Sequence, residues 1–265
     1  MTIETLISTM HQTDHCLLKR MNIQTDAIVI NQCERNAFEQ FEYNGYTIKW
    51  YDFSERGVGL SRNSAIMRAM ADIVLFADDD LEYIDGYAQS ILDVFEENKK
   101  ADMIIFDVNI LNDHREIRNF RKIEQCHSLY WYNSMRYGAC RIAMRRNELL
   151  KRNVYYSLLF GGGARYSSGE DSLFIRQCLS KKMKAIAYPL RIAKVDSSTS
   201  TWYEGANEKY YMDKGILLYA AFPLIYPLIY VYYAGRYRNA QKSFIYLLKT
   251  FFKGRSVYID RTQCK

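Results

Sequence analysis

Three consecutive carboxylates follow an apolar segment in the first third of the chain. Residues 73–77 are all apolar, and Asp78, Asp79 and Asp80 come directly after them. Because side chains alternate along a strand, a strand that runs over Asp72–Asp78 and on through the triplet would direct Asp78 and Asp80 to one side. Two such carboxylates can share a divalent cation, and oxygen ligands suit Mg²⁺ or Mn²⁺. The triplet could also be a solvated turn or a helix N-cap, but repulsion between like charges after a buried strand favours a metal site.

An acidic pair, Glu170 and Asp171, follows a glycine-rich stretch in the second half of the chain. The stretch runs from Phe160 to Gly169, and the residues after the pair have helical composition. Carboxylates at the start of a helix can simply complement the helix dipole. A carboxylate can also accept the proton of an attacking hydroxyl group. The spacing leaves both roles open.

A second glycine-containing segment, Arg56–Asn63, lies upstream of the acidic triplet. It joins an expected strand to an expected helix that is rich in Ala and Met. Glycine allows close approach of the backbone, and the first turn of a helix offers free amide groups to an anion. Such junctions often serve only tight packing, but Arg62 and Asn63 favour a role in ligand binding.

Strands that alternate with helices would position these groups. Apolar runs predict the strands Thr5–Met10, Ala27–Asn31, Tyr46–Phe53, Asp72–Asp78 and Ala101–Ile110. The composition of the segments between them predicts the helices Leu17–Met21, Val58–Met70 and Tyr87–Asn98. This alternation implies parallel βαβ units in a doubly wound α/β sheet. Ligands of such sheets bind beyond the carboxyl ends of the strands, where the acidic triplet falls.

Charge and cysteine content restrict the class of protein. The net charge is +6, but residues 236–255 carry six basic side chains and no acidic one, so the rest of the chain is balanced. This distribution disfavours nucleic-acid binding and indicates that the basic segment contacts an anionic membrane. The six cysteines include no CxxC pair, so neither a zinc site nor a disulfide framework is expected. The first residues lack a basic stretch that leads into an apolar one, so we expect no secretory signal and a cytoplasmic catalytic domain.

The segments Arg56–Ala65 and Asp72–Asp80 together resemble the nucleotide-sugar half of family 2 glycosyltransferases, which have the GT-A fold. A DxD-type motif holds the metal in that family. The resemblance implies that Asp78 and Asp80 contact the metal and the donor diphosphate, and that Asp79 binds the donor sugar or ribose. It also implies further donor-binding positions, namely Thr9, His11, Asn31, Arg56, Arg62 and Asn63.

The stretch Gly161–Asp171 matches the glycine-rich segment and acidic pair of inverting family 2 enzymes. The resemblance places this segment beside the acceptor, and it implies acceptor contacts at Gly162, Gly163 and Arg165. An acceptor hydroxyl needs a carboxylate within hydrogen-bond reach to take its proton as it attacks the anomeric carbon. We assign that role to Asp171, with Glu170 as the neighbouring candidate.

Many relatives also carry a histidine after this helix, near the metal or the diphosphate. No histidine lies in Pro189–Trp202 of this chain, and Asp196 is the corresponding acidic residue. Asp196 is therefore a secondary candidate for a metal ligand. The alternative is that it caps a turn, as Asp often does.

The C-terminal segment combines apolar, aromatic and basic residues. Residues 216–234 carry no charge and approach the length of a bilayer span, but Pro223 and Pro227 interrupt the helix and the tyrosines favour the membrane interface. Further on, one face of an expected helix collects the apolar residues Phe244, Leu247, Leu248, Phe251 and Phe252. With basic residues around it, this face suits an anionic membrane surface, and packing on the catalytic core is the alternative.

These patterns predict a GT-A catalytic domain over residues 1–210, with a nucleotide-sugar half at 1–111 and an acceptor half at 112–210. Residues 211–265 would form a membrane-associating segment. The expected function is inverting transfer of a sugar from a nucleotide-diphosphate sugar to a glycan or lipid-linked acceptor, in surface polysaccharide or lipopolysaccharide assembly on the inner face of the plasma membrane.

Two other functions fit parts of the sequence. A metal-dependent nucleotidyltransferase would have a glycine-rich loop directly after the first strand, and Ser8–Gln12 contains no glycine. A non-catalytic nucleotide-sugar-binding protein on the same fold would not need both acidic motifs.

Overall fold

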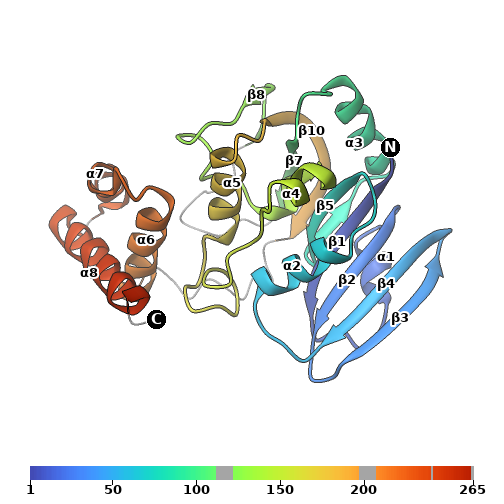
Figure 1. The fold of residues 1–265 in the computed structure, drawn as a ribbon, viewed down its shortest axis with the longest axis horizontal. Coiled ribbons are helices and arrows are strands. Elements are labelled where there is room, and N and C mark those ends of the chain that lie inside the picture. Colours follow the sequence, from blue (N-terminus) through green and yellow to red (C-terminus); the bar gives the residue numbers. More distant parts are fainter. Residues whose placement is uncertain (112–121, 197–206, 240, 264–265) are drawn as a thin grey trace.

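The computed structural model describes residues 1–111, 122–196, 207–239 and 241–263. They form an α/β domain and a C-terminal group of three helices (Figure 1). Ten strands in these ranges form one sheet in the order β3-β4-β2-β1-β5-β9-β7-β10-β6, with β8 paired to β10. The strands are β1 (Ile3–Met10), β2 (Asp26–Gln32), β3 (Ala37–Tyr43), β4 (Tyr46–Phe53), β5 (Ile73–Asp78), β6 (Leu81–Tyr83), β7 (Met103–Leu111), β8 (His127–Ser128), β9 (Ile142–Arg145) and β10 (Ala185–Asp196).

The first half of the sheet is parallel. β1 pairs in parallel with β2 and β5, and β2 pairs in parallel with β4. The carboxyl ends of these four strands therefore meet at one edge, which we call the C-terminal edge of the sheet. The expected α/β architecture with a largely parallel centre is confirmed.

The second half of the sheet is mixed. β9 lies between β5 and β7 and is antiparallel to both, so β5 and β7 run in the same direction. β10 is parallel to β7, while β6 and β8 are short strands antiparallel to β10. The carboxyl ends of β7 and β10 thus lie at the same edge as those of β1 and β5.

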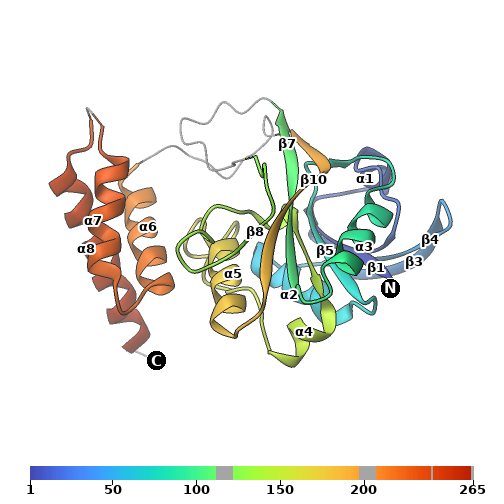
Figure 2. The same ribbon diagram turned by 90° about the horizontal axis from the view of Figure 1, so that it is seen from above.

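Helices cover both faces of the sheet (Figures 1 and 2). Apolar side chains of α1 (Cys16–Arg20) and α3 (Tyr87–Glu97) pack on one face. Apolar side chains of α2 (Val58–Arg68), α4 (Arg146–Lys151) and α5 (Glu170–Ser180) pack on the other. A short 3-10 helix at Ala139–Arg141 precedes β9. The three layers bury the runs that the hydrophobic pattern identified as strands.

Two local features differ from the sequence prediction. β3 was not predicted, because residues 37–43 form a largely exposed edge strand without an apolar run. β5 ends at Asp78, and Asp79 and Asp80 form the turn before β6. The alternation that would direct Asp78 and Asp80 to one side therefore stops at Asp78.

The C-terminal helices are α6 (Glu208–Ala221), α7 (Tyr226–Tyr237) and α8 (Phe244–Gln263). The helical unit begins at Glu208, three residues before the predicted boundary. Pro223 lies between α6 and α7, and Pro227 occupies the first turn of α7, where its missing N–H has no cost. None of the helices in the described ranges is both long enough and apolar enough to cross a membrane.

The apolar face predicted on α8 is used mainly for packing against α6 and α7. Leu247 and Phe251 are fully buried, together with Leu218 of α6 and Tyr230 of α7. The backbones approach closely, since a Cβ at Gly215 of α6 would meet the backbone of Phe251 at 2.5 Å. The helix therefore packs on its neighbouring helices, and only part of the predicted membrane face is free.

The three helices dock on the α/β domain through α6. Asp213 accepts hydrogen bonds from the backbone N–H and hydroxyl of Ser167, at 3.2 and 3.1 Å. Gly169, the N-cap residue of α5, lies against Leu217, and a Cβ there would come within 2.5 Å of that side chain. These contacts fix the glycine-rich stretch against α6.

Candidate active site

Arg62 connects the acidic triplet to the acidic pair. Its Nη2 lies 2.7 Å from Oδ1 of Asp78, and its Nη1 lies 2.7 Å from Oδ1 of Asp171. Nη1 also lies 3.3 Å from Oε1 of Glu170. Asp78 ends β5, Arg62 is in α2, and the pair begins α5, so three elements bring these groups to the C-terminal edge. Sequence reasoning identified all four residues.

The buried guanidinium carries a permanent charge. The side chain of Arg62 is only 4% exposed. Burial alone would lower the pKa of Arg62, but the carboxylates of Asp78 and Asp171 outweigh it and hold that pKa well above its ordinary value. Three carboxylates thus share one cation, which leaves an excess of negative charge at this edge.

The pKa of Asp171 is unusual for a carboxyl group. Burial raises it to about 7 against the opposing charge of Arg62, and the negative charges of Glu170 and Asp78 add to the rise. A base works best when its pKa lies near the working pH. Asp171 therefore has the proton affinity that a general base needs near neutrality.

The other two carboxylates of the triplet, Asp79 and Asp80, lie in the turn after β5. Asp79 Oδ2 accepts a hydrogen bond of 2.6 Å from the hydroxyl of Thr9, at the end of β1. The pKa of the Cys140 thiol is raised well above its ordinary value by burial, and the negative charges of Asp78 and Asp80 add to the rise. Asp79 thus has a partner at the end of β1, and Asp79 and Asp80 belong to a turn and not to the strand for which alternation was predicted.

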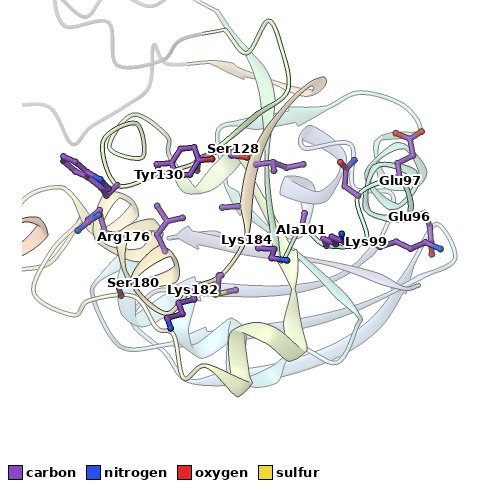
Figure 3. Close-up of a pocket in the computed structure, with 18 residues that line it drawn as sticks. Glu96, Glu97, Lys99, Ala101, Ser128, Tyr130, Arg176, Ser180, Lys182 and Lys184 are labelled. Carbon is purple, nitrogen blue, oxygen red and sulfur yellow. The ribbon is translucent and has the colours of Figure 1, made fainter.

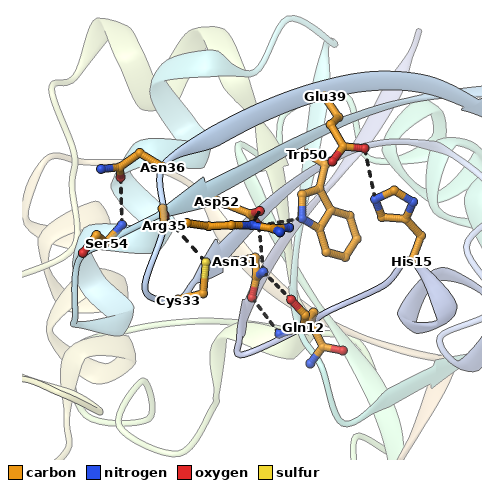
Figure 4. Close-up of polar contacts among 10 residues, drawn as sticks. All are labelled: Gln12, His15, Asn31, Cys33, Arg35, Asn36, Glu39, Trp50, Asp52 and Ser54. Atoms are coloured by element: carbon orange, nitrogen blue, oxygen red, sulfur yellow. Dashed lines mark hydrogen bonds and ion pairs between the residues drawn. The ribbon is translucent and has the colours of Figure 1, made fainter.

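The ends of β1, β2 and β4 form a polar network beside the triplet (Figure 4). Asn31 donates to Asp52 at 2.7 Å, and it exchanges hydrogen bonds of 3.0 and 2.9 Å with the backbone of Gln12. Asp52 also accepts from Nε1 of Trp50 at 3.0 Å and from Nε of Arg35. Asp52 is itself 1% exposed. Its bond to Arg35 holds the loop after β2, and its bond to Asn31 orients the amide that holds the loop after β1.

His11 and Arg56 lie together between this network and α2. One Nη of Arg56 lies 3.3 Å from Nε2 of His11 and 3.1 Å from Glu34. The other donates to the backbone carbonyl of Gln32 at 2.9 Å. The predicted donor residues of β1, β2 and the α2 junction are thus brought together.

Asn63 and the glycine-rich stretch have mainly structural contacts. The Asn63 amide forms two hydrogen bonds, of 2.9 and 2.7 Å, with the backbone of Tyr156, and these hold α2 against that segment. The carbonyl of Gly162 accepts a hydrogen bond of 2.9 Å from the backbone N–H of Val58, the first residue of α2. This N–H is therefore already bonded within the protein. A Cβ on Gly163 would meet the backbone of Gly57 at 3.0 Å, whereas Arg165 is exposed.

Asp78, Asp80 and Asp196 are the residues that the sequence predicts as metal ligands. Asp196 is the last residue of β10, and its side chain lies outside the described residues. In the part of the chain that the structure describes, no three His, Cys, Asp or Glu side chains are grouped so as to hold a metal ion. The carboxylate oxygens of Asp78 and Asp80 are of the kind that Mg²⁺ or Mn²⁺ prefers, and these two residues could hold such an ion together with donor phosphate oxygens or water.

Sequence reasoning missed two components of the site. Asp52 ends a predicted parallel strand, and its place at the same edge as Asn31 was the signal that could have identified it. Tyr156 lies in an irregular segment, with its ring centroid 5.1 Å from the Arg62 guanidinium and stacked on Phe174 at 4.0 Å. No local pattern marks Tyr156, because only the tertiary fold brings it to Arg62.

Comparison with solved structures identifies the fold. S. aureus TarS residues 1–349 in complex with UDP-GlcNAc aligns with a TM-score of 0.62 and 14% identity, over 84% of this chain and 67% of that one. The UDP complex aligns with a TM-score of 0.60 and 14% identity, over 84% and 66%. The chain spans 39% of a longer TarS structure. Among curated proteins, none matches the sequence significantly.

The sequence itself matches a family model. The model describes glycosyl transferase family 2, and it covers residues 11–153, which hold the network at β2, the α2 junction and the acidic triplet. The match spans more than half of the chain and includes Arg62 and Asp78. The chain therefore belongs to glycosyltransferase family 2.

Proposed function

We propose that the chain transfers a sugar, with inversion, from a nucleotide-diphosphate sugar to a hydroxyl group of a glycan or lipid-linked acceptor. The observation that carries this proposal is the convergence of Asp78, Glu170 and Asp171 on Arg62. It places the end of β5, where a donor would bind, next to the carboxylates at the start of α5. A donor and an acceptor bound at these two places would lie next to each other.

Asp171 acts as the general base in this proposal. Its carboxylate takes the proton of the acceptor hydroxyl while the hydroxyl oxygen forms a bond to the anomeric carbon. The bond from that carbon to the diphosphate breaks on the opposite side, and the nucleoside diphosphate leaves with the bonding electrons. Such a single displacement inverts the anomeric configuration. The pKa of Asp171, about 7, leaves a large fraction of the base deprotonated at neutral pH.

The donor would lie along the C-terminal edge from β4 to β5. Asn31 is fully buried, and its hydrogen bonds to the Gln12 backbone would hold the loop after β1 in place beside the nucleoside. His11 with Arg56 lies between this loop and α2. Asp79, held by Thr9, would face the ribose or the sugar. UDP-GlcNAc, which is bound in the TarS structure, is a suitable first donor to test.

A divalent cation would be held by Asp78 and Asp80 together with donor phosphate oxygens. The excess of carboxylates around Arg62 and their oxygen donors fit Mg²⁺ or Mn²⁺. When bound, such a cation neutralises charge on the departing diphosphate. Arg62 holds Asp78 in place for this role and keeps Asp171 next to it.

Donor turnover tests the proposal. The purified chain is incubated with a panel of nucleotide sugars, including UDP-GlcNAc, with Mn²⁺ or with a chelator. We expect slow release of a nucleoside diphosphate that stops with the chelator, and NMR of a glycoside product should show inversion. Release of pyrophosphate would indicate a nucleotidyltransferase instead, and donor binding without turnover would indicate a non-catalytic binding protein.

We also propose that the three C-terminal helices bind an anionic membrane from the cytoplasmic side, where a lipid-linked acceptor for surface polysaccharide would lie. Leu224, Leu228 and Val231, at the start and along α7, are 94%, 73% and 52% exposed. Basic residues Arg236 and Arg238 follow in the chain. Exposed apolar side chains flanked by cations suit the headgroup region of anionic lipids.

Flotation with liposomes of phosphatidylglycerol tests the membrane proposal. The double variant Leu224→Glu with Leu228→Glu should lose most of the lipid-bound fraction, because it puts two like charges into the apolar patch. Met70→Glu, at an equally exposed position in the α/β domain (71%), is the matched control and should bind as the unchanged protein does. Equal flotation of all three proteins would exclude this surface.

A further inference from the structure

A groove of about 1020 Å³ lies outside the candidate active site. It runs from the end of α5 across the beginning of β10 to the end of α3 (Figure 3). Its apolar floor includes Leu129, Leu179, Met183 and Ile186. This volume is at the upper end of the range for small-molecule pockets, so the groove could hold an oligomer.

The groove is at the opposite edge of the sheet from the acidic triplet. It contacts Ala101, just before β7, and Lys184 and Ala185 at the beginning of β10. Because β5, β7 and β10 run in the same direction, these residues are at the N-terminal edge. α5 connects the two sites, since it begins with Glu170 and Asp171 and ends at Ser180 in the groove. From Asp171 to Ser180 the helix rises by about 14 Å.

Positive charge dominates the groove. Its lining includes five cations against the two carboxylates of Glu96 and Glu97, and the cations are Lys99, Lys100, Arg176, Lys182 and Lys184. Within the described residues, the four lysine ammonium groups have no hydrogen-bond or ion-pair partner, and all four lysines are exposed. Unpaired cations that line a concave surface attract an anion.

Two aromatic side chains lie at the end of the groove near α5. Tyr130 is 52% exposed and Trp131 is 49% exposed. Trp131 packs edge-on against Phe222 at 6.1 Å, and Arg176 lies over the same Phe222 ring at 4.7 Å. The Arg176 guanidinium also donates twice to the carbonyl of Ala221 at the end of α6, at 3.2 and 3.1 Å. The C-terminal helices thus hold this end of the groove in place.

We propose that the groove binds an anionic glycan, as an accessory site for an acceptor that carries negative charge along its length. Exposed aromatic rings offer flat apolar surfaces to sugar rings, and the lysines offer cations to carboxylate or phosphate groups on the same chain. A single-stranded nucleic acid would bind to similar groups. It is the less suitable occupant, because the α/β domain is balanced in charge and Glu96 and Glu97 are part of the lining. The inference rests on the proposed function, since the growing end of this glycan would lie at Asp171.

Binding of a labelled oligogalacturonate, measured by fluorescence anisotropy, tests the groove without any turnover. We expect binding to the full chain that weakens with added salt. The double variant Lys182→Ala with Lys184→Ala should weaken it about tenfold, since it removes two charge contacts. Trp131→Ala should weaken it severalfold, and Trp131→Phe should restore most of the loss. Lys19→Ala, an exposed lysine of α1 outside the groove, should change nothing.

Three results would overturn the proposal. The groove variants could bind oligogalacturonate as tightly as the unchanged chain does, or the unchanged chain could bind uncharged maltodextrin as tightly as oligogalacturonate. The third result is that oligothymidylate binds more tightly than oligogalacturonate and that the groove variants abolish this binding. Release of nucleoside diphosphate from the donor is measured in parallel on each variant. If the chain turns over the donor but the groove variants bind the glycan as the unchanged chain does, the groove proposal is rejected and the proposed function stands. If glycan binding depends on the groove but the chain shows no donor turnover, the proposed function is rejected and the groove remains a glycan-binding site.

Discussion

Nη1 of Arg62 lies 2.7 Å from Oδ1 of Asp171, and this contact joins α2 to the first turn of α5. The other terminal nitrogen of the same guanidinium binds Asp78 at the end of β5. One buried cation therefore sets the distance between the residue proposed to approach the donor and the residue proposed to deprotonate the acceptor. A change at Arg62 should affect both.

Replacement of Arg62 by lysine tests this double contact. Lysine keeps the charge, but its single ammonium group cannot span two carboxylates as the planar guanidinium does. We expect kcat to fall about 100-fold, because the base and the donor site lose their relative position. We also expect a loss of about 1–3 kcal/mol in the free energy of unfolding. Donor turnover and urea unfolding measure the two effects.

Arg68→Lys is the matched control for that variant. Arg68 is in the same helix, and its guanidinium lies over Tyr51 at 4.7 Å, away from the acidic cluster. Arg68 is half-buried and bonds to Ser64, but it has no contact with the acidic cluster, so we expect turnover within about twofold of the unchanged chain. Similar losses in both variants would mean that α2 is merely sensitive to lysine.

Asp171→Asn and Glu170→Gln distinguish the two candidates for the base. Both variants keep the size of the side chain and remove its negative charge. Loss of a general base costs about 10²- to 10⁴-fold in kcat, so we expect that loss in Asp171→Asn and a smaller one in Glu170→Gln. Donor affinity, measured by calorimetry, should change little in either variant. A larger loss in Glu170→Gln would reverse the assignment.

The raised pKa of Asp171 predicts how activity depends on pH. Burial raises that pKa from 3.8 to about 7, and a base must be deprotonated to act. We therefore expect kcat/KM to rise with pH and to level off above about pH 7. In Asp171→Asn the residual activity should lose this rise, and a rise that persisted there would belong to another group.

The same shift predicts a pH dependence of stability. The folded state holds the Asp171 proton more firmly than the unfolded state does. This group therefore stabilises the fold fully below its unfolded pKa, near 4, and the contribution is lost as the pH rises through about 7. Urea unfolding at pH 5 and pH 8 should show a smaller difference for Asp171→Asn than for the unchanged chain.

The sequence predicts local elements and acidic motifs better than it predicts their neighbours. The apolar runs before Asp78 and in β2 identified strands because parallel strands are buried on both faces. The edge strand β3 was missed because its side chains are largely exposed. The hydrogen bonds of the Asn63 amide with the backbone of Tyr156, which is remote in sequence, were not predicted. Contacts of this kind depend on how α2 packs, and no local pattern records them.

The apolar face of α8 shows the same limit. A helical pattern shows which residues share a face, but not whether a membrane or another helix covers it. Leu247 and Phe251 pack on α6 and α7, whereas Phe252 on the same face is 42% exposed. The exposed apolar residues of α7 could be recognised only once the packing of the three helices was known.

Gly161→Ala tests whether the glycine-rich stretch positions the acidic pair. Gly161 has a φ of +106°, and a Cβ there would come within 2.8 Å of Cδ of Glu170 and 2.7 Å of a methyl group of Val58. Alanine would therefore strain the backbone and displace Glu170, which shares Arg62 with Asp171. We expect a loss of about 1–3 kcal/mol in the free energy of unfolding and a fall in kcat, with little change in donor affinity.

Gly235→Ala is the control for this variant, because no atom lies within 4 Å of its added Cβ. Gly235 is in α7, where alanine has the higher helix propensity, so stability should stay the same or rise by up to about 1 kcal/mol. Turnover should not change. If Gly161→Ala kept full turnover while it lost stability, the close contact with Glu170 would matter for packing alone, and the position of the base would have to depend on Arg62.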